Sequence, residues 1–254
     1  MRDLKHLILL TCTVKTRMTS NMKRSDPVVR LNDYVKSIRR WNQLAKKNNW
    51  RIVIAENSNS IDSIKNSLTS AEIGNLQFIP TRLDNESHLE GNSKGEFNIL
   101  QELISVHAPN YKHDYLWKIT GRLFIPNFPK IANNATGELV VNRLHASKHQ
   151  IDARIIGFKP ILFNSMFSQS VIFSHHYPRV YESSYESMEH FLTQKTLDLE
   201  ISGATISTME QAPIFIGISG TSNKRIDDFT SRNKKRIANL LRPIVIKLLA
   251  GSSP

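Results

Sequence analysis

The sequence predicts an α/β fold built on a mixed, mainly parallel sheet with helices on both faces. Residues 6–14 (HLILLTCTV) form a continuous apolar run, which is typical of a strand covered on both sides. From residue 27 to residue 44, apolar side chains recur every three or four positions, which indicates a helix. A second β-rich run and a second helical pattern follow. This β-α-β-α-β order favours parallel strands joined by right-handed crossovers.

The remaining elements follow in order along the chain. The next predicted elements are a strand in 50–55, a helix over 61–73, a strand in 76–81, a helix over 96–107 and a strand from 114. Beyond them we expect short strands in 137–143, 154–158 and 161–173, and a helix over 184–200 with Ser184 as a possible N-cap.

Composition and charge limit the classes of partner. The chain has 254 residues with 34 Lys and Arg against 22 Asp and Glu, a formal net charge of +12. Such an excess favours nucleic acid, anionic lipid or phosphorylated substrates as partners. The single cysteine, Cys12, cannot form an intrachain disulfide, which fits a reducing compartment. We expect one α/β domain over residues 1–221 and a basic amphipathic tail over 222–254.

The start of the chain gives no sign of a targeting segment. Its apolar stretch is too short to span a bilayer, and no small-residue cleavage site follows it. We therefore expect a cytoplasmic protein.

Polar clusters follow three of the predicted strands. They are Thr11–Thr13, Glu56–Ser58 and Lys118–Arg122. In open α/β sheets, ligands bind beyond the carboxyl ends of the strands, so these clusters together indicate a site. For each cluster taken singly, an ordinary polar loop is the favoured interpretation.

The loop over residues 91–96 could bind an anion. Gly91 and Gly95 allow positive φ and close backbone approach, Lys94 adds a positive charge, and a helix is expected to start just after them. The spacing matches neither a P-loop nor G-x-G-x-x-G. The alternative is a plain turn.

Lys118 and Arg122 stand out because an apolar strand precedes them and apolar residues follow. A lysine is costly to bury without a partner. One hypothesis is a structural ion pair between Lys118 and Glu96, Glu102 or Asp114. We favour the other, in which Lys118 and Arg122 point into a cleft and bind a phosphate, for which the fork of arginine is well suited.

Further candidates lie in the second half of the chain. Asp152 and Arg154 are next to a predicted strand, and Glu186, Glu189 and His190 share one helix face. The alternative for the helix residues is a solvated face. The four histidines His145, His149, His175 and His176 lack zinc-site spacing, so we expect no metal there.

Several of these segments together resemble bacterial glycosyltransferases of the surface-polysaccharide type, which have a GT-A-like nucleotide-sugar domain. The segments are HLILLTCTV, IVIAENS, SKGEFNILQELI, YLWKITGRLFIPN and MEHFL, and K-x-T-G-R at 118–122 is the most specific motif. The resemblance implies a nucleotide-sugar donor pocket. Its expected residues are Thr11, Glu56, Asn57, Lys94, Gly95, Glu96, Lys118, Thr120, Gly121, Arg122 and Asp152. Glu189 and His190 would lie near the acceptor or the leaving group. Apart from the resemblance, we expect Arg154 to bind substrate.

The chain departs from the GT-A pattern at one place. Most GT-A enzymes carry Asp-x-Asp at the end of the central strand to hold a divalent metal, and Lys118–Arg122 stands there instead. We therefore expect no metal cofactor, with Lys118, Arg122 and Lys94 meeting the leaving nucleotide's charge. A CMP-sugar donor would fit the same reasoning, because its leaving group carries one phosphate and needs less charge neutralisation. Asp152, Glu56 or Glu189 could serve as general base for the acceptor hydroxyl.

The basic tail suggests where such an enzyme would work. Apolar residues of the tail can share one helix face, with lysines and arginines beside them. A helix of this kind binds an anionic membrane surface, which fits a lipid-linked glycan acceptor at the inner leaflet. The alternative is a helix packed on the domain.

Two other functions compete with glycosyl transfer. A nucleic-acid-binding α/β protein would explain the charge, but the sequence lacks an RNP motif, zinc-finger spacing or a clear helix-turn-helix, and we expect no nucleic-acid partner. A dinucleotide oxidoreductase or a methyltransferase ranks last, because TCTVKTR replaces the glycine fingerprint after the first strand.

Overall fold

The structure is a computed structural model of the chain. It describes residues 5–16, 23–81, 92–107, 113–143, 150–169, 171–173, 184–185, 187–220 and 222–226.

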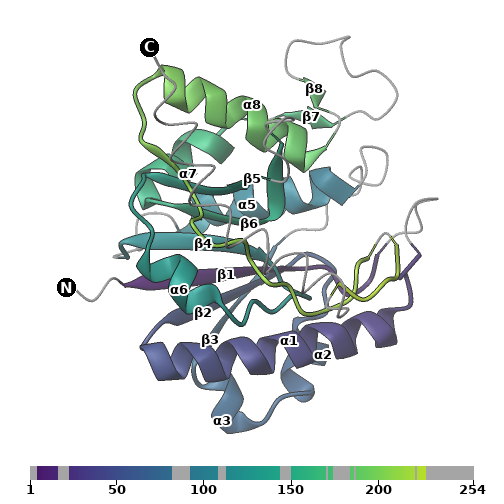
Figure 1. Cartoon of the computed structure of the whole chain (residues 1–254). Helices are drawn as coiled ribbons and strands as arrows, with labels where there is room; N and C mark the ends of the chain where they lie inside the picture. The colour runs from purple at the N-terminus through teal and green to yellow at the C-terminus, as the bar shows by residue number, and fades with distance from the viewer. Residues whose placement is uncertain are drawn as a thin grey trace.

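A seven-stranded sheet forms the centre of the protein (Figure 1). Its strand order is β3 (Leu76–Pro80), β2 (Arg51–Glu56), β1 (His6–Cys12), β4 (Tyr115–Thr120), β6 (Ile151–Phe158), β5 (Leu139–Arg143) and β9 (Ile206–Thr208). Strand β6 is antiparallel to both of its neighbours, and every other pairing in this sheet is parallel. The predicted mixed, mainly parallel sheet is confirmed. A separate parallel pair joins β7 (Ile172–Phe173) to β8 (Ser184–Tyr185).

The reversed direction of β6 decides which residues meet at one edge of the sheet. Strands β1, β2 and β4 end at this edge, and β6 begins there. We call it the carboxyl edge. The start of β6 therefore lies level with the ends of β1 and β4, although β6 follows β4 in the chain.

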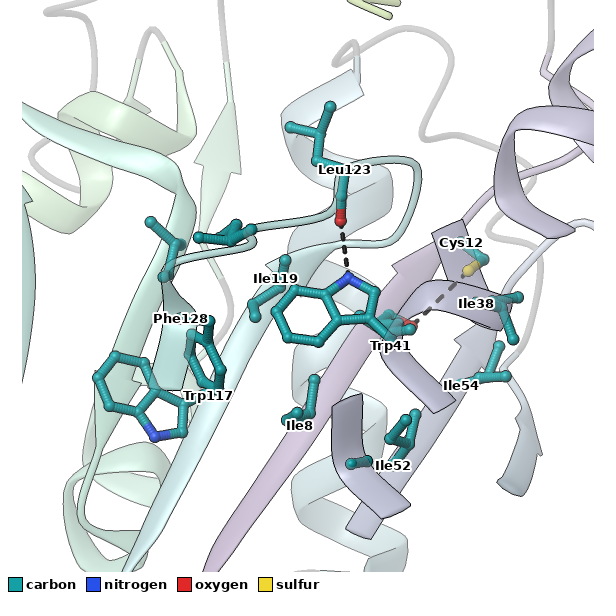
Figure 2. Close-up of a cluster of buried hydrophobic side chains, with 14 of the residues drawn as sticks. Ile8, Cys12, Ile38, Trp41, Ile52, Ile54, Trp117, Ile119, Leu123 and Phe128 are labelled. Carbon is teal, nitrogen blue, oxygen red and sulfur yellow. Dashed lines mark hydrogen bonds between the residues drawn. The ribbon is translucent and has the colours of Figure 1, made fainter. Parts of the chain in front are cut away.

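One face of the sheet is covered by α1 (Pro27–Asn48) and α6 (Phe128–Asn133). Helix α1 starts where the Asp26 side chain caps the amides of Val28 and Val29 at 2.8 and 3.0 Å, and it ends at Asn49 in the left-handed conformation. Its buried Trp41 packs among the apolar side chains of β1, β2 and β4, and the Trp41 indole Nε1 donates to the Leu123 carbonyl at 2.8 Å (Figure 2). This bond ties α1 to the segment that follows β4.

The opposite face is covered by α5 (Asn92–His107), α7 (Pro160–Phe167) and α8 (Met188–Ile201), which Figure 1 shows on the far side of the sheet from α1. Phe97, Phe167 and Phe191, one from each helix, pack against one another with ring centroids 5.2–5.8 Å apart. The alternating residues of β1 divide between the two cores, so β1 is buried along its whole length, as the sequence predicts.

Three predicted elements differ from the structure. Residues 161–167 of the expected strand 161–173 lie in helix α7, because Pro160 starts a helix readily and Phe163, Met166 and Phe167 repeat at helical spacing. The expected helix 61–73 is two short helices, α2 (Ile61–Asn66) and α3 (Ser70–Ile73). The N-cap of α8 is Ser187, whose hydroxyl accepts from the His190 amide, whereas Ser184 lies in β8.

The C-terminal tail is described only at its beginning. Of the predicted tail 222–254, residues 222–226 are described, so the amphipathic-helix expectation lies outside the described residues. Among the helices that the structure describes, none combines the length and the apolar character needed to cross a membrane.

A buried histidine makes stability depend on pH. His6 lies in β1, where its Nδ1 accepts a hydrogen bond from the Trp117 indole at 3.1 Å and its ring packs near Trp50 and Tyr115. Burial lowers the pKa of His6 from 6.5 to about 4, although Asp114 partly opposes the shift. The folded protein therefore holds His6 neutral.

Acid should destabilise the protein through His6. Because the pKa is lower in the folded state, the stability that His6 contributes is present above pH 6.5 and is lost as pH falls toward 4. Between pH 7.5 and 4.5 we expect the wild type to lose about 2–3 kcal/mol more unfolding free energy than His6→Asn, whose Oδ1 can still accept from Trp117. Urea denaturation at both pH values measures the difference. Parallel pH profiles for the two proteins would contradict the assignment.

Candidate functional site

A buried carboxylate shapes the loops that follow β1 and β2. Glu56 is 1% exposed, and its Oε2 accepts from the amides of Ser58 and Ser60 at 3.0 and 2.8 Å. Its Oε1 accepts from the Val14 amide at 3.2 Å and from the Ser58 hydroxyl, which in turn accepts from the Lys15 amide at 2.9 Å. The sequence-based expectation that Glu56 is a candidate general base does not fit this geometry, because both oxygens are buried and hydrogen-bonded. Glu56 instead holds the two loops together.

Arg30 supports the loop after β1 from the side of α1. It is buried, and its guanidinium donates to the carbonyls of Thr13 at 2.5 and 3.0 Å, Val14 at 3.2 Å and Arg24 at 3.1 Å. Burial lowers the pKa of Arg30. Sequence analysis missed this residue. Its position four residues before Tyr34, in the buried stripe of α1, is the signal that could have found it.

Three segments meet at the carboxyl edge through Asn57. The Thr13 hydroxyl donates to Asn57 Oδ1 at 2.7 Å, and Asn57 Nδ2 donates to the Gly95 carbonyl at 3.4 Å. These two hydrogen bonds bring the polar loops after β1 and β2 together with Gly95 of α5. The Thr13 amide donates to the Tyr34 hydroxyl at 3.0 Å, which adds α1 to the same group.

Lys94 and Gly95 do not form the expected glycine loop. Both lie inside helix α5, so Gly95 does not use its freedom to adopt positive φ, and a Cβ there would meet Asn57 at an ordinary 3.6 Å. The Lys94 ammonium donates to the Val171 carbonyl at 2.8 Å. Gly91 lies outside the described residues.

Lys118 is a buried structural cation. It is 1% exposed, and its Nζ lies 2.7 Å from Glu96 Oε1 and donates to the Ala153 carbonyl. Glu96 Oε1 also accepts from the Thr11 hydroxyl at 2.9 Å. The expectation that Lys118 points into a cleft toward phosphate is wrong, and its alternative, an ion pair with Glu96, is the observed arrangement. The Lys118 ammonium therefore links β4 to α5 through Glu96 and to β6 through Ala153, and Thr11 adds β1 through the same Glu96 carboxylate.

Gly121 is required by close packing at the end of β4. Its amide donates to the Thr11 carbonyl at 2.9 Å, and a Cβ would lie 2.7 Å from Cys12 Sγ and 2.8 Å from that carbonyl. Thr120, half-buried, pairs in register with Thr11. Thr120 and Gly121 of the K-x-T-G-R motif therefore allow the end of β4 to pack closely against β1.

Arg122 is held beside Tyr34. Its guanidinium carbon lies 5.7 Å from the centre of the Tyr34 ring, and its Nη1 donates to the Tyr34 hydroxyl at 3.4 Å. The same hydroxyl accepts from the Thr13 amide. The buried Arg122 Nε has no hydrogen-bond partner within the part of the chain that the structure describes. Arg122 therefore lies at the carboxyl edge, and no described residue accepts a hydrogen bond from its Nε.

Asp152 and Arg154 pair with each other at the start of β6. Arg154 Nε and Nη2 donate to the two Asp152 carboxylate oxygens, both at 2.7 Å, and Asn142 adds a hydrogen bond at 2.9 Å. The Arg154 guanidinium lies 4.2 Å from the centre of the Phe215 ring. Asp152 is buried, so this arrangement does not fit the expected role of a general base that reaches a bound hydroxyl.

Glu189 and His190 lie in the first turn of α8. Glu189 is half-buried and His190 is exposed. The α8 start is tied to α5, because the Met188 amide donates to the Ser93 hydroxyl at 3.1 Å, and to β6, because the Ile151 amide donates to Thr193 Oγ1 at 3.1 Å. This helix therefore begins close to the carboxyl edge. Glu186 lies outside the described residues.

The residues at the end of β4 do not fit a divalent metal. Lys118, Thr120 and Arg122 offer no carboxylate, and divalent ions of the Mg²⁺ and Mn²⁺ type prefer carboxylate, carbonyl and water oxygens. Over the described ranges, no three His, Cys, Asp or Glu side chains gather into a metal-binding group. His145, His149, His175 and His176 lie outside those ranges.

No protein-family model matches the sequence, and no curated protein sequence matches it. Solved structures with a similar arrangement include the glycosyltransferase GlyE of Streptococcus pneumoniae, the galactosyltransferase LgtC in complex with donor and acceptor sugar analogs, and HddC of Yersinia pseudotuberculosis.

These likenesses are distant. GlyE is 9% identical with a TM-score of 0.48 over 82% of this chain, which spans 45% of the GlyE chain. LgtC is 6% identical with a TM-score of 0.47, covering 80% of this chain and 72% of LgtC. HddC is 11% identical with a TM-score of 0.41, covering 91% and 97%. We therefore base the functional proposal on the residues of the carboxyl edge.

Removing the Lys118 charge should destabilise the protein more than removing a surface cation. Lys118→Met leaves Glu96 and the Ala153 carbonyl without their partner, and we expect a loss of about 2–4 kcal/mol of unfolding free energy. The double variant with Glu96→Gln should recover at least part of it. Arg39→Met, which breaks the exposed pair with Glu72, should cost at most about 1 kcal/mol. Equal losses for Lys118→Met and Arg39→Met in urea denaturation would contradict the role of Lys118.

Proposed function

We propose that the protein transfers a sugar from a nucleotide-sugar donor to a hydroxyl of a glycan or lipid-linked glycan, without a divalent metal. The observation that supports it best is the connected group at the carboxyl edge, in which Gly95, Asn57, Thr13, Tyr34 and Arg122 are linked by consecutive hydrogen bonds. Ligands of open α/β sheets bind beyond this edge. The resemblance carried by K-x-T-G-R points to the same class of donor.

Arg122 is the residue we assign to the donor phosphates. Of the three cations expected to meet them, Lys118 is paired with Glu96 and Lys94 donates to Val171. The Arg122 guanidinium is fixed by Tyr34, and a fixed cation stabilises the charge that develops on a departing nucleoside phosphate without reorganising during the step. Arginine thus takes the place that Asp-x-Asp and a metal fill in most GT-A enzymes.

Glu189 is the residue we assign to the acceptor. The carboxylates of Asp152 and Glu56 are buried and hydrogen-bonded, whereas Glu189 is half-buried and its carboxylate accepts no hydrogen bond from the described residues. In the transfer step the acceptor oxygen bonds to the anomeric carbon, the bond from that carbon to the phosphate oxygen breaks, and the acceptor proton passes to Glu189. His190, next to it, would contact the acceptor.

The setting of the reaction follows from the resemblance and the charge. We propose a role in bacterial surface-polysaccharide synthesis, such as capsule or lipopolysaccharide, at the cytoplasmic side of the membrane. The net charge of +12 and the basic residues beyond position 226 support contact with an anionic leaflet carrying a lipid-linked acceptor.

Arg122→Ala should abolish most donor turnover. With UDP-, GDP- and CMP-sugars tested as donors, we expect kcat/KM for the accepted sugar nucleotide to fall about 10²–10³-fold. The reason is the loss of a positioned hydrogen-bond donor to the charge that develops on the leaving phosphate. Wild-type activity should persist in EDTA. Arg51→Ala removes an exposed arginine at the opposite edge of the sheet and should leave turnover unchanged. Full activity of Arg122→Ala, or activity only with Mn²⁺, would count against the proposal.

Glu189→Gln should slow the transfer step while leaving donor binding intact. We expect kcat to fall about 10²–10⁴-fold, since the glutamine cannot accept the proton. The rise in melting temperature that the accepted donor causes should match that of the wild type. Glu200→Gln, an exposed change near the other end of α8, is the matched control. If both variants transfer sugar at the wild-type rate, Glu189 is not the base.

A further inference from the structure

A pocket lies between α1, residues 122 and 124, residues 216–218 and Arg225. Its volume is about 320 Å³. It is lined by Asp33, Lys36, Ser37, Arg40, Arg122, Phe124, Ile216, Gly217, Ile218 and Arg225. Thr13, Asn57 and Gly95 do not line it, and Arg122 is the residue that it shares with the carboxyl edge.

The pocket is strongly cationic. Lys36, Arg40, Arg122 and Arg225 bring four positive charges, and the single acidic residue, Asp33, is paired with Arg24 at 2.5 and 3.0 Å. Lys36 and Arg40 are four residues apart on α1, a spacing at which like charges destabilise a helix. The sequence therefore keeps these two cations together at a cost to the helix.

Two polar groups in the pocket walls have no partner among the described residues. The Ser37 side chain is 3% exposed, and its Oγ makes no hydrogen bond there. The buried Arg122 Nε is the other. An unpaired buried donor is costly to a protein, so both groups are suited to bind a ligand that accepts hydrogen bonds.

The pocket walls are fixed before any ligand arrives. Arg40 lies 6.0 Å from the centre of the Phe124 ring, which packs edge-on against Trp41. Phe124 and Ile216 exchange two backbone hydrogen bonds at 2.8 and 2.9 Å. Arg40 and Arg122 are therefore held against aromatic rings beside a paired backbone.

We propose that this pocket binds the phosphate group of a second ligand, distinct from the sugar donor. Guanidinium groups and a hydroxyl donor match the tetrahedral oxygens of a phosphate. A volume of about 320 Å³ lies at the lower end of ligand pockets, which suits a phosphate with a small substituent better than a whole nucleotide sugar. The proposal goes beyond glycosyl transfer, and its test measures binding without a donor.

Calorimetric titration of the full chain with inorganic pyrophosphate tests the pocket. Ser37→Ala leaves the net charge unchanged and should weaken binding at least fivefold, because the hydroxyl donor is lost. Its melting temperature without ligand should not fall, since the hydroxyl it removes is buried and has no hydrogen-bond partner among the residues that the structure describes. Lys36→Gln with Arg40→Gln should weaken binding at least tenfold. Lys46→Gln with Lys47→Gln, the same charge change at the end of the same helix, should alter it less than twofold.

Co-sedimentation with phosphatidylglycerol vesicles separates the two sources of the phosphate. Pyrophosphate binding that weakens in the pocket variants and not in the control supports a soluble phosphorylated ligand. Vesicle binding that alone shows this pattern supports a lipid headgroup in the same pocket. If neither assay distinguishes Ser37→Ala and the Lys36 and Arg40 double variant from the control, the pocket is not a phosphate site and the proposal is overturned.

Discussion

The buried charge of Lys118 is the constraint on which the arrangement of the carboxyl edge depends. An ammonium group enclosed on a central strand needs a counter-charge and hydrogen-bond acceptors, and it finds them in Glu96 and the Ala153 carbonyl. Glu96 is on α5 and Ala153 is on β6, so one charge fixes the start of a helix and of an antiparallel strand against β4. Thr11 adds β1 to the same carboxylate.

The loops that follow β1 and β2 are also held in place by buried charged side chains. In the loop after β1, Glu56 accepts from the Val14 amide and Arg30 donates to the Thr13 and Val14 carbonyls, so that loop is fixed from two sides. Tyr34 then links this loop to Arg122. Helix α1 serves two sites as a result, because Tyr34 contacts the carboxyl edge while Lys36 and Arg40 line the cationic pocket. A binding surface built this way loses little freedom when a ligand arrives.

Hydrophobic patterning was a sound guide to the sheet and to the long helices. The run in β1 and the repeat in α1 are each produced by one dominant physical demand, burial on both faces or on one stripe. Patterning failed at α7, where an apolar stretch of eight residues suits a buried strand and a buried helix equally well. The start of α8 was misplaced because Ser184 and Ser187 are equivalent as N-caps until the fold positions them.

The sequence by itself determined the α/β class, the edge at which polar residues would gather, and the positive charge of the chain. Only the tertiary structure decided which charged groups are paired with other groups of the protein. Lys118 and Arg122 are four residues apart in one motif, yet a distant glutamate neutralises the first, while the second lies over a tyrosine ring with its Nε unpaired among the described residues. The reason is that charge compensation depends on distances between groups in space, and Glu96 and Tyr34 become neighbours of the motif only when α5 and α1 pack on opposite faces of the sheet.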